Sequence, residues 1–428
     1  MKSILITNVY SYKNKGDATI VLSLIQELER VFSPKNIDIQ STDFKNDINK
    51  YPNIQTLGPT LMWVVLSSNR KKNIFLKICH ILLCLVGISL TLIRYKLTKN
   101  TNYIGRNQSL KKYFEMVFNS DLVIACGGGY LRTSSRSPAN NLLLLITCMN
   151  FFIPKLLGKK VYLYSQSIGP IFGNFQKFLL CYVLNRVDLI LVREQISYQL
   201  LTKMDIQSEF EQVADSAFIF NKLTQKSSQF QFSSPLSKEM NVGLTVRDWF
   251  ENQNQQDKYE QTIAKFIDYL YRNHSAKTFY FPQVIASQFG DDDRKSANRL
   301  KKYLKNKESL IIENKDLHPK ELVNFASQMD YFVGTRMHSN ILSLIAQTPV
   351  IAIEYEHKTR GIMKDMGLEN YVINIEELNF KSLVAKFEEI TKDYKSYKEQ
   401  ISKNITIVNK KAELAMDLIK KSYNNENT

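Results

Sequence analysis

The residues that point most directly to chemistry stand in the run Gly334-Thr335-Arg336-Met337-His338-Ser339, between an apolar strand and a helix. Arg336 can bind a carboxylate or phosphate through two parallel hydrogen bonds. His338 can transfer protons near neutral pH. His357 follows the next predicted strand, 349–353, so we expect it at the same edge of the sheet. This spacing predicts a site for a small anionic substrate.

Three further groups also follow predicted strands and suit an anionic ligand. Asn14-Lys15-Gly16-Asp17 opens a helix whose backbone amides attract anions, and Asp17 could deprotonate a hydroxyl or simply cap the helix. Gly127, Gly128 and Gly129 would let a ligand approach the backbone closely. Arg193 and Arg247 each end an apolar strand, where each could bind the substrate or pair with a neighbouring acid.

Several classes of protein are disfavoured by what the sequence lacks. It has no P-loop, no GxSxG and no Cys, His and carboxylate grouping with metal-ligand spacing, so we expect neither a metal nor a bound cofactor. The formal net charge of +16 favours anionic partners. No motif supports nucleic-acid binding, so we expect none. The five cysteines lie in apolar surroundings, which is typical of a reducing compartment such as the cytosol.

The elements that must position these residues alternate between apolar strands and helices. A length of 428 residues predicts two or three domains. We expect an N-terminal domain over 1–222, a polar linker over 223–239 and a second domain over 240–428. Alternating strands and helices indicate doubly wound parallel sheets, so the predicted architecture is α/β, with two Rossmann-like domains facing each other across a cleft.

An apolar segment with basic flanks interrupts the N-terminal series at 70–99. Its uninterrupted apolar part, Ile81 to Ile93, is shorter than the roughly 20 residues of a membrane-spanning helix. A helix lying in the anionic membrane interface fits the basic flanks better. A helix packed on the N-terminal domain is the third interpretation.

These motifs together carry a resemblance to the polysaccharide pyruvyl transferase family, most closely to its colanic acid branch. The GTRMHS run and the block Tyr355-Glu356-His357-Lys358 are the specific elements. Less specific matches cover the rest of the chain to about residue 375: Asn14-Lys15-Gly16-Asp17, Gly127-Gly128-Gly129-Tyr130, Ser167-Ile168-Gly169-Pro170 and Leu191-Val192-Arg193-Glu194. The resemblance implies a fold like that of the GT-B glycosyltransferases. It also implies transfer of pyruvate from phosphoenolpyruvate, a co-substrate, to a sugar as a cyclic ketal.

The resemblance also implies roles for particular residues. It supports Arg336 and His338 in donor binding, and Glu356, His357 and Lys358 belong to the matched block. Two fixed cations should clamp the donor's carboxylate and phosphate, and we expect Arg336 and Arg193, followed by Arg247 and Lys358. His338 would donate the proton, and Asp17, expected in the opposite domain, would act as the base.

The implied acceptor is a lipid-linked or growing surface polysaccharide, handled on the cytosolic side. A peripheral position on the inner face of the plasma membrane would suit such an acceptor and the segment 70–99. Two alternatives stay open: a GT-B glycosyltransferase that uses a sugar nucleotide in exopolysaccharide synthesis, and a non-catalytic peripheral membrane protein that scaffolds polysaccharide assembly.

Overall fold

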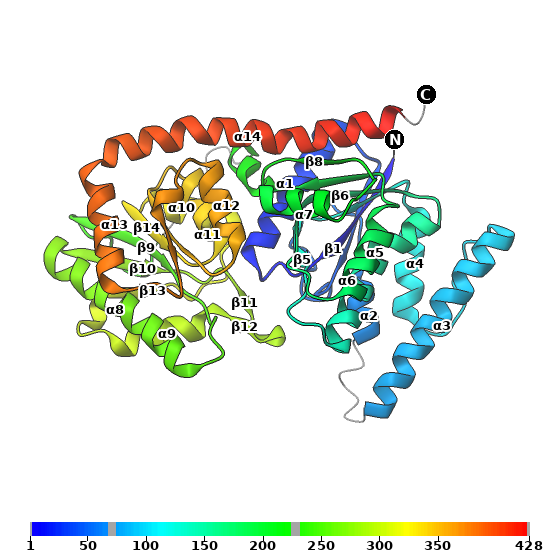
Figure 1. The fold of residues 1–428 in the computed structure, drawn as a ribbon, viewed down its shortest axis with the longest axis horizontal. Helices are drawn as coiled ribbons and strands as arrows, with labels where there is room; N and C mark the ends of the chain where they lie inside the picture. Colours follow the sequence, from blue (N-terminus) through cyan, green and yellow to red (C-terminus); the bar gives the residue numbers. More distant parts are fainter. Residues whose placement is uncertain (1, 67–73, 224–231, 426–428) are drawn as a thin grey trace. The chain divides into compact units, whose positions relative to one another are not determined.

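The computed structural model describes residues 2–66, 74–223 and 232–425, which form two compact units, each built on a parallel β-sheet (Figure 1). Unit 1 contains the residues up to Tyr12, Ile20–Ser216 and the residues from Glu413 onward. Unit 2 contains Lys13–Thr19 and Ala217–Ala412. The predicted α/β fold with two Rossmann-like domains is confirmed, and the cleft between the domains stays a prediction.

The sheet of unit 1 has the strand order of a Rossmann fold. Its strands are β1 (Ser3–Val9), β2 (Asn36–Ser41), β3 (Thr56–Pro59), β4 (Leu122–Ala125), β5 (Gly128–Leu131), β6 (Lys160–Ile168), β7 (Leu189–Val192) and β8 (Phe210–Gln212). They run in the order β3-β2-β1-β4-β6-β7-β8, and β5 pairs with the C-terminal part of β6. Parallel strands covered on both faces are apolar throughout, and every residue of β7 is buried.

Helices cover this sheet and form the core with it. They are α1 (Lys15–Phe32), which begins in unit 2, and α2 (Leu61–Leu66), α3 (Ile74–Thr98), α4 (Gln108–Asn119), α5 (Pro138–Leu156), α6 (Asn174–Leu184) and α7 (Gln195–Lys203). Buried aromatic and aliphatic side chains such as Phe114, Phe151 and Leu180 pack against strand residues such as Val123 and Leu163. One buried cluster of unit 1 therefore lies between the sheet and the helices α2, α4, α5 and α6.

The sheet of unit 2 repeats the Rossmann order with six parallel strands. They are β9 (Met240–Thr245), β10 (Ala276–Tyr280), β13 (Leu310–Ile312), β14 (Tyr331–Gly334), β15 (Val350–Glu354) and β16 (Val372–Asn374). Their order is β13-β10-β9-β14-β15-β16, so the direction of winding reverses between β9 and β14. Ligands of open α/β sheets bind at the carboxyl ends of the strands beside such a reversal. A small antiparallel hairpin of β11 (Ile285–Ala286) and β12 (Asp291–Asp292) follows β10.

Seven helices that include residues of unit 2 follow its strands. They are α8 (Gln253–His274), α9 (Asp293–Tyr303), α10 (Pro319–Ser327), α11 (Met337–Ile345), α12 (His357–Asp365), α13 (Phe380–Lys392) and α14 (Tyr394–Asn425). Short 3₁₀ turns occupy η2 (Ser216–Leu223), η3 (Ser287–Phe289), η4 (Lys307–Ser309) and η5 (Glu369–Tyr371). The helices α11 and α12 begin directly after β14 and β15, so the residues at their starts are held at the sheet edge.

Two short segments belong to a different unit from the one that their place in the chain predicts. Lys13–Thr19 belongs to unit 2, where the Lys15 amide donates to the carbonyl of Gln283 at 2.9 Å. The residues of α14 from Glu413 belong to unit 1, where the rings of Tyr423 and Phe32 lie 6.1 Å apart. Long-range contacts decide both assignments, and the sequence alone did not reveal them.

The predicted linker is only partly a linker. Its residues 224–231 lie outside the described residues. The described end packs on unit 2, because the amide and hydroxyl of Ser233 both donate to Glu313 at 2.6 Å and the rings of Phe232 and Phe279 lie 4.9 Å apart. The boundary between the units falls between Ser216 and Ala217.

Within the part of the chain that the structure describes, two helices, α3 and α5, are long and apolar enough to cross a membrane by length and composition. They differ in burial, since 44% of the apolar window in α5 is buried but only 22% of that in α3. Helix α5 packs on β1, β4 and β6 like a core helix. The basic residues Arg70, Lys71 and Lys72 before α3 lie outside the described residues, and whether α3 meets a membrane stays a prediction.

Candidate active site

The turn between β14 and α11 is held rigidly by buried hydrogen bonds. The Thr335 amide donates to the carbonyl of Thr245 at 3.2 Å, and the hydroxyls of Thr335 and Tyr259 lie 2.7 Å apart. The side chain of Asn340 donates to the carbonyl of Gly334 at 3.2 Å. These contacts place Arg336 immediately before α11 and His338 in its first turn, at the carboxyl edge of the sheet.

Arg336 is buried and bound by two carboxylates. Its Nε donates to Asp293 at 3.1 Å and its Nη2 to Asp291 at 2.5 Å. Asp293 also accepts the backbone amides of Gln283 and Val284, at 3.1 and 3.0 Å. Burial raises the pKa of the Asp293 carboxyl, and the Arg336 charge opposes that effect. The two carboxylates therefore compensate the charge of Arg336, and the sequence did not predict this pairing.

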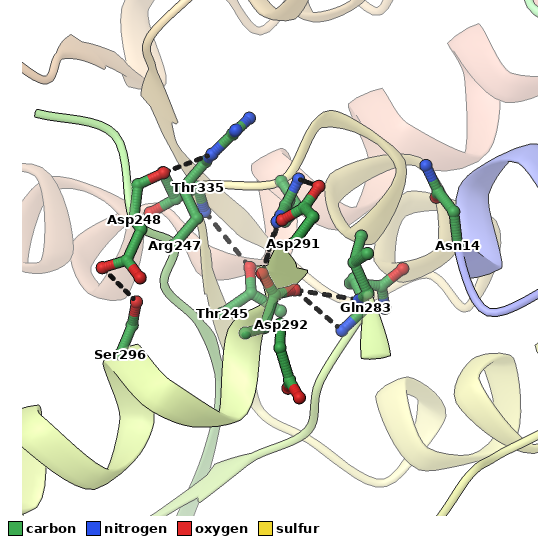
Figure 2. Close-up of polar contacts among 12 residues, drawn as sticks. Asn14, Thr245, Arg247, Asp248, Gln283, Asp291, Asp292, Ser296 and Thr335 are labelled. Carbon is green, nitrogen blue, oxygen red and sulfur yellow. Dashed lines mark hydrogen bonds and ion pairs between the residues drawn. The ribbon is translucent and has the colours of Figure 1, made fainter. Parts of the chain in front are cut away.

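The start of α1 lies beside the segment that binds Arg336. Asn14 forms an antiparallel bridge with Val284, and Figure 2 shows Asn14 on the side of Gln283. Asn14, not Asp17, caps the helix, because its side-chain oxygen accepts the amide of Gly16 at 3.1 Å. Asp17 lies in the first turn and accepts a hydrogen bond from the Asn14 amide group at 2.7 Å.

Gly16 brings this first turn into contact with His338. A Cβ atom on Gly16 would lie 2.8 Å from the Cβ of His338 and closer still to the imidazole ring. Asp17 therefore lies one residue from a direct contact with His338, and both belong to unit 2. The expectation that Asp17 comes from the opposite domain is wrong, because the contacts of Lys13–Thr19 place it in unit 2.

Arg247 lies at the end of β9 against two aromatic rings. Its guanidinium is 4.3 Å from the ring centre of Tyr355 and 5.3 Å from that of Trp249, and these rings lie 4.7 Å apart. Its Nε donates to the carbonyl of Asp248 at 3.2 Å, as Figure 2 shows. No carboxylate in the described ranges forms an ion pair with Arg247. Its positive charge is thus available for an anion.

Three cations act on the phenol of Tyr355. Burial opposes ionisation of its phenol, but Arg247, Lys358 and Arg336 together outweigh burial and the charge of Glu356, so the pKa of Tyr355 is lowered. Lys358 lies in the first turn of α12 and pairs with Glu356 at 2.6 Å, while His357 begins the helix and is partly exposed. A tyrosine with a lowered pKa is a candidate for proton transfer.

The remaining predicted site residues lie in unit 1. Arg193 is fully buried, donating to Asp215 at 2.6 Å and to the hydroxyl of Ser167 at 2.7 Å. Gly127 packs on the backbone of β6, where a Cβ atom would lie 2.7 Å from the carbonyl oxygen of Ser165. Gly128 and Gly129 begin β5. These contacts give Arg193 and Gly127 structural roles, and their predicted substrate contacts stay predictions.

Three residues of this site were not predicted from the sequence, and a fourth, Tyr355, was placed in the matched block but given no role. Asp291 and Asp293 follow Gly290 in an acidic run, a signal that could have indicated a partner for an arginine. Tyr355 directly follows β15, as binding residues often follow strands, and Trp249 lies in the loop after β9, but nothing local marks the two as neighbours. No group of three or more His, Cys, Asp or Glu residues that could hold a metal occurs among the described residues.

Comparison with known proteins identifies a family and a type of fold. Residues 14–357 match the family model described as polysaccharide pyruvyl transferase. The amylovoran biosynthesis protein AmsJ of Erwinia amylovora is 25% identical over 259 residues, which are 58% of this chain and 62% of that protein. The match thus spans about three fifths of the length of this relative.

Solved structures with similar folds share little sequence with this chain. A putative UDP-N-acetylglucosamine 2-epimerase from Listeria monocytogenes is 11% identical with a TM-score of 0.58, covering 100% of this chain and 97% of that one. Anabaena HepE in complex with UDP-glucose is 10% identical with a TM-score of 0.54, covering 100% of both chains. At such identities the likeness shows the fold alone, and that fold is of the GT-B type.

Proposed function

Because the chain belongs to the polysaccharide pyruvyl transferase family, we propose that it transfers pyruvate from phosphoenolpyruvate to two hydroxyls of one sugar, forming a cyclic ketal and releasing phosphate. The observation that carries this proposal is the group of cations at the carboxyl ends of β9, β14 and β15. Arg247, Arg336 and Lys358 all act on the phenol of Tyr355 there. A donor with a carboxylate and a phosphate on one carbon needs such a group of cations.

Arg247 is the first donor ligand that we propose, because no carboxylate among the described residues pairs with it and its guanidinium lies against the rings of Tyr355 and Trp249. We expect Arg336 to keep Asp293 and to exchange Asp291, whose side chain is 35% exposed, for an anionic group of the donor. Lys358 would supply a further positive charge. Arg193 is not needed for this clamp, since its guanidinium is bound by Asp215 and Ser167.

The chemistry requires one proton at carbon and one at phosphate. The methylene carbon of phosphoenolpyruvate gains a proton, a sugar hydroxyl adds to the neighbouring carbon and loses its proton, and phosphate leaves. The second hydroxyl then closes the ring and loses its proton, which replaces the proton that the leaving phosphate took from the enzyme. We propose that His338 protonates the carbon, Asp17 takes the proton of the first hydroxyl, and Tyr355 donates to the leaving phosphate. The contact of Gly16 with His338 supports the roles of His338 and Asp17, because it brings Asp17 within one residue of that imidazole.

The acceptor that we propose is a sugar of a surface polysaccharide or of its lipid-linked precursor, and the place of the reaction is the cytoplasmic face of the membrane. The relative named for amylovoran biosynthesis supports a polysaccharide acceptor. The sugar-nucleotide glycosyltransferase remains the alternative. The closer likeness to the colanic acid branch stays a prediction.

One incubation separates these functions. Purified protein is given a panel of lipid-linked oligosaccharides with either phosphoenolpyruvate or UDP-sugars, and products are identified by mass spectrometry. Addition of a pyruvate ketal with release of phosphate supports the proposal. Addition of a sugar from the nucleotide, with phosphoenolpyruvate inert, would replace it with glycosyl transfer.

A further inference from the structure

The positive charge of the chain is concentrated in one segment of unit 1. Residues 48–187 contain 18 Lys and Arg but only two acids, Glu115 and Asp121, which is a net charge of +16. The rest of the chain holds 39 basic and 39 acidic residues and is therefore neutral. The whole charge excess lies in the segment that includes α3, α5 and α6. This concentration is typical of a protein that meets an anionic surface.

Helix α3 exposes an apolar face of unusual size. Nine of its large apolar side chains are exposed, and Leu97 reaches 78%: Phe75, Leu76, Ile78, Leu82, Leu83, Val86, Leu90, Ile93 and Leu97. The opposite face, with Cys84, Ile88 and Thr91, is buried on unit 1. The Thr91 hydroxyl accepts the amide of Ile104 at 3.1 Å. The helix is thus attached along one face and presents the other to its surroundings.

Helix α6 adds a second, aromatic stripe. Phe175, Phe178 and Tyr182 recur at the spacing of one helix face and are exposed, Phe178 to 67%, and Phe172 precedes them. The buried face of α6 holds Leu179, Leu180, Val183 and Leu184. The guanidinium of Arg186 lies 3.7 Å from the ring centre of Tyr182. Aromatic rings beside cations are typical of membrane interfaces.

Both stripes belong to one connected set of helices in unit 1. Helix α2 packs against α3 and α5, and α5 packs against α6 (Figure 1). Soluble monomers rarely expose so many neighbouring large apolar side chains, and such surfaces mark contact sites. The absence of any acidic residue from both α3 and α6 favours an anionic contact, such as lipid headgroups, over a positively charged one.

We propose that unit 1 docks onto the surface of a bilayer that contains anionic lipid, with the exposed faces of α3 and α6 entering the interface. Because one face of α3 is buried on unit 1, the helix lies in the interface and does not span the bilayer. The basic residues around α3, such as Lys96, Lys99 and Arg106, would meet the lipid headgroups. This surface does not depend on the proposed pyruvyl transfer, although a lipid-linked acceptor would lie at the same membrane.

Flotation of the full chain with vesicles tests the surface without any substrate. We expect binding to phosphatidylcholine vesicles that contain phosphatidylglycerol and release as salt rises. Leu83→Gln and Phe178→Ser should each weaken binding about tenfold or more, because each removes one inserted apolar side chain. Lys99→Gln should weaken it about fivefold. Ile407→Gln and Lys403→Gln, at exposed sites of α14 in unit 2, are matched controls that should bind normally.

Three outcomes would overturn the proposal. Equal binding to vesicles without phosphatidylglycerol at all salt concentrations would remove the role of charge. Binding that resists both high salt and alkaline extraction would indicate a spanning helix. The wild-type chain could also fail to bind vesicles and instead self-associate in light scattering. If Leu83→Gln and Phe178→Ser abolish that self-association, the surface binds a second copy of the chain. Circular dichroism of each variant checks that the fold is kept, and phosphoenolpyruvate turnover with a soluble acceptor tests the proposed function separately.

Discussion

The backbone of Gly16 lies directly against the imidazole of His338, although more than three hundred residues separate them in the sequence. The contact joins the start of α1 to the start of α11 within unit 2. There is no room for a side chain at position 16, so glycine is required there by space and not by backbone conformation. The relationship ties the proposed base, Asp17, to the proposed proton donor.

Gly16→Ala should therefore displace the His338 ring. We expect a destabilisation of about 1–3 kcal/mol from overpacking and a large loss of phosphoenolpyruvate turnover. Thermal unfolding and kcat measure the two effects. In a His338→Ala background the same substitution should cost little stability, because the ring is gone. An equal cost in both backgrounds would mean that the strain comes from another neighbour.

Arg247→Ala should raise the KM for phosphoenolpyruvate tenfold or more, because a charge-assisted bond worth about 1.5–3 kcal/mol is lost. Arg247→Lys should recover only part of the affinity that Arg247→Ala loses, because a lysine can neither form two parallel hydrogen bonds to one anion nor stack on the ring of Tyr355. Arg272→Gln, at an exposed arginine of α8, is the matched control. If the KM for phosphoenolpyruvate is unchanged in both Arg247 variants, the donor does not bind Arg247.

Tyr355→Phe tests the proposed donation to phosphate. The surrounding cations lower the pKa of Tyr355 below that of an ordinary tyrosine, so the wild-type kcat should fall at alkaline pH as the phenol loses its proton. The phenylalanine variant should have a lower kcat and no such alkaline fall. Arg247→Ala should shift the fall to higher pH, because one stabilising cation is removed. An unchanged pH profile in Tyr355→Phe would exclude the phenol from the reaction.

Removing the charge of Asp293 should lower the stability of the fold, whereas removing the charge of Asp291 should lower the KM for phosphoenolpyruvate. Asp293 is buried and holds Arg336 and two backbone amides, so Asp293→Asn should cost about 3 kcal/mol of stability, measured by chemical unfolding. Asp291 is partly exposed, and Asp291→Asn should lower the KM for phosphoenolpyruvate because a competing carboxylate is weakened. A raised KM in Asp291→Asn would show that the donor does not replace this carboxylate.

Local patterns were enough to predict much of the fold. The alternation of apolar strands and helices is where the fold prediction succeeded, and the apolar run Leu189–Val192 illustrates why, since a strand buried on both faces is apolar throughout. The turn that ends in Arg336 and His338 is also where the sequence predicts it. The linker prediction failed at Ser233, because its hydrogen bonds to Glu313 join residues far apart in the chain.

The sequence by itself determined the order of strands and helices, the family and the excess of positive charge, because each depends on residue types at short spacing. Only the tertiary structure decided which charges meet. It joined Arg336 to Asp291 and Asp293, buried Arg193 on Asp215, and left Arg247 on the aromatic rings of Trp249 and Tyr355. Strand order brings such residues together over long separations, and no local periodicity records it.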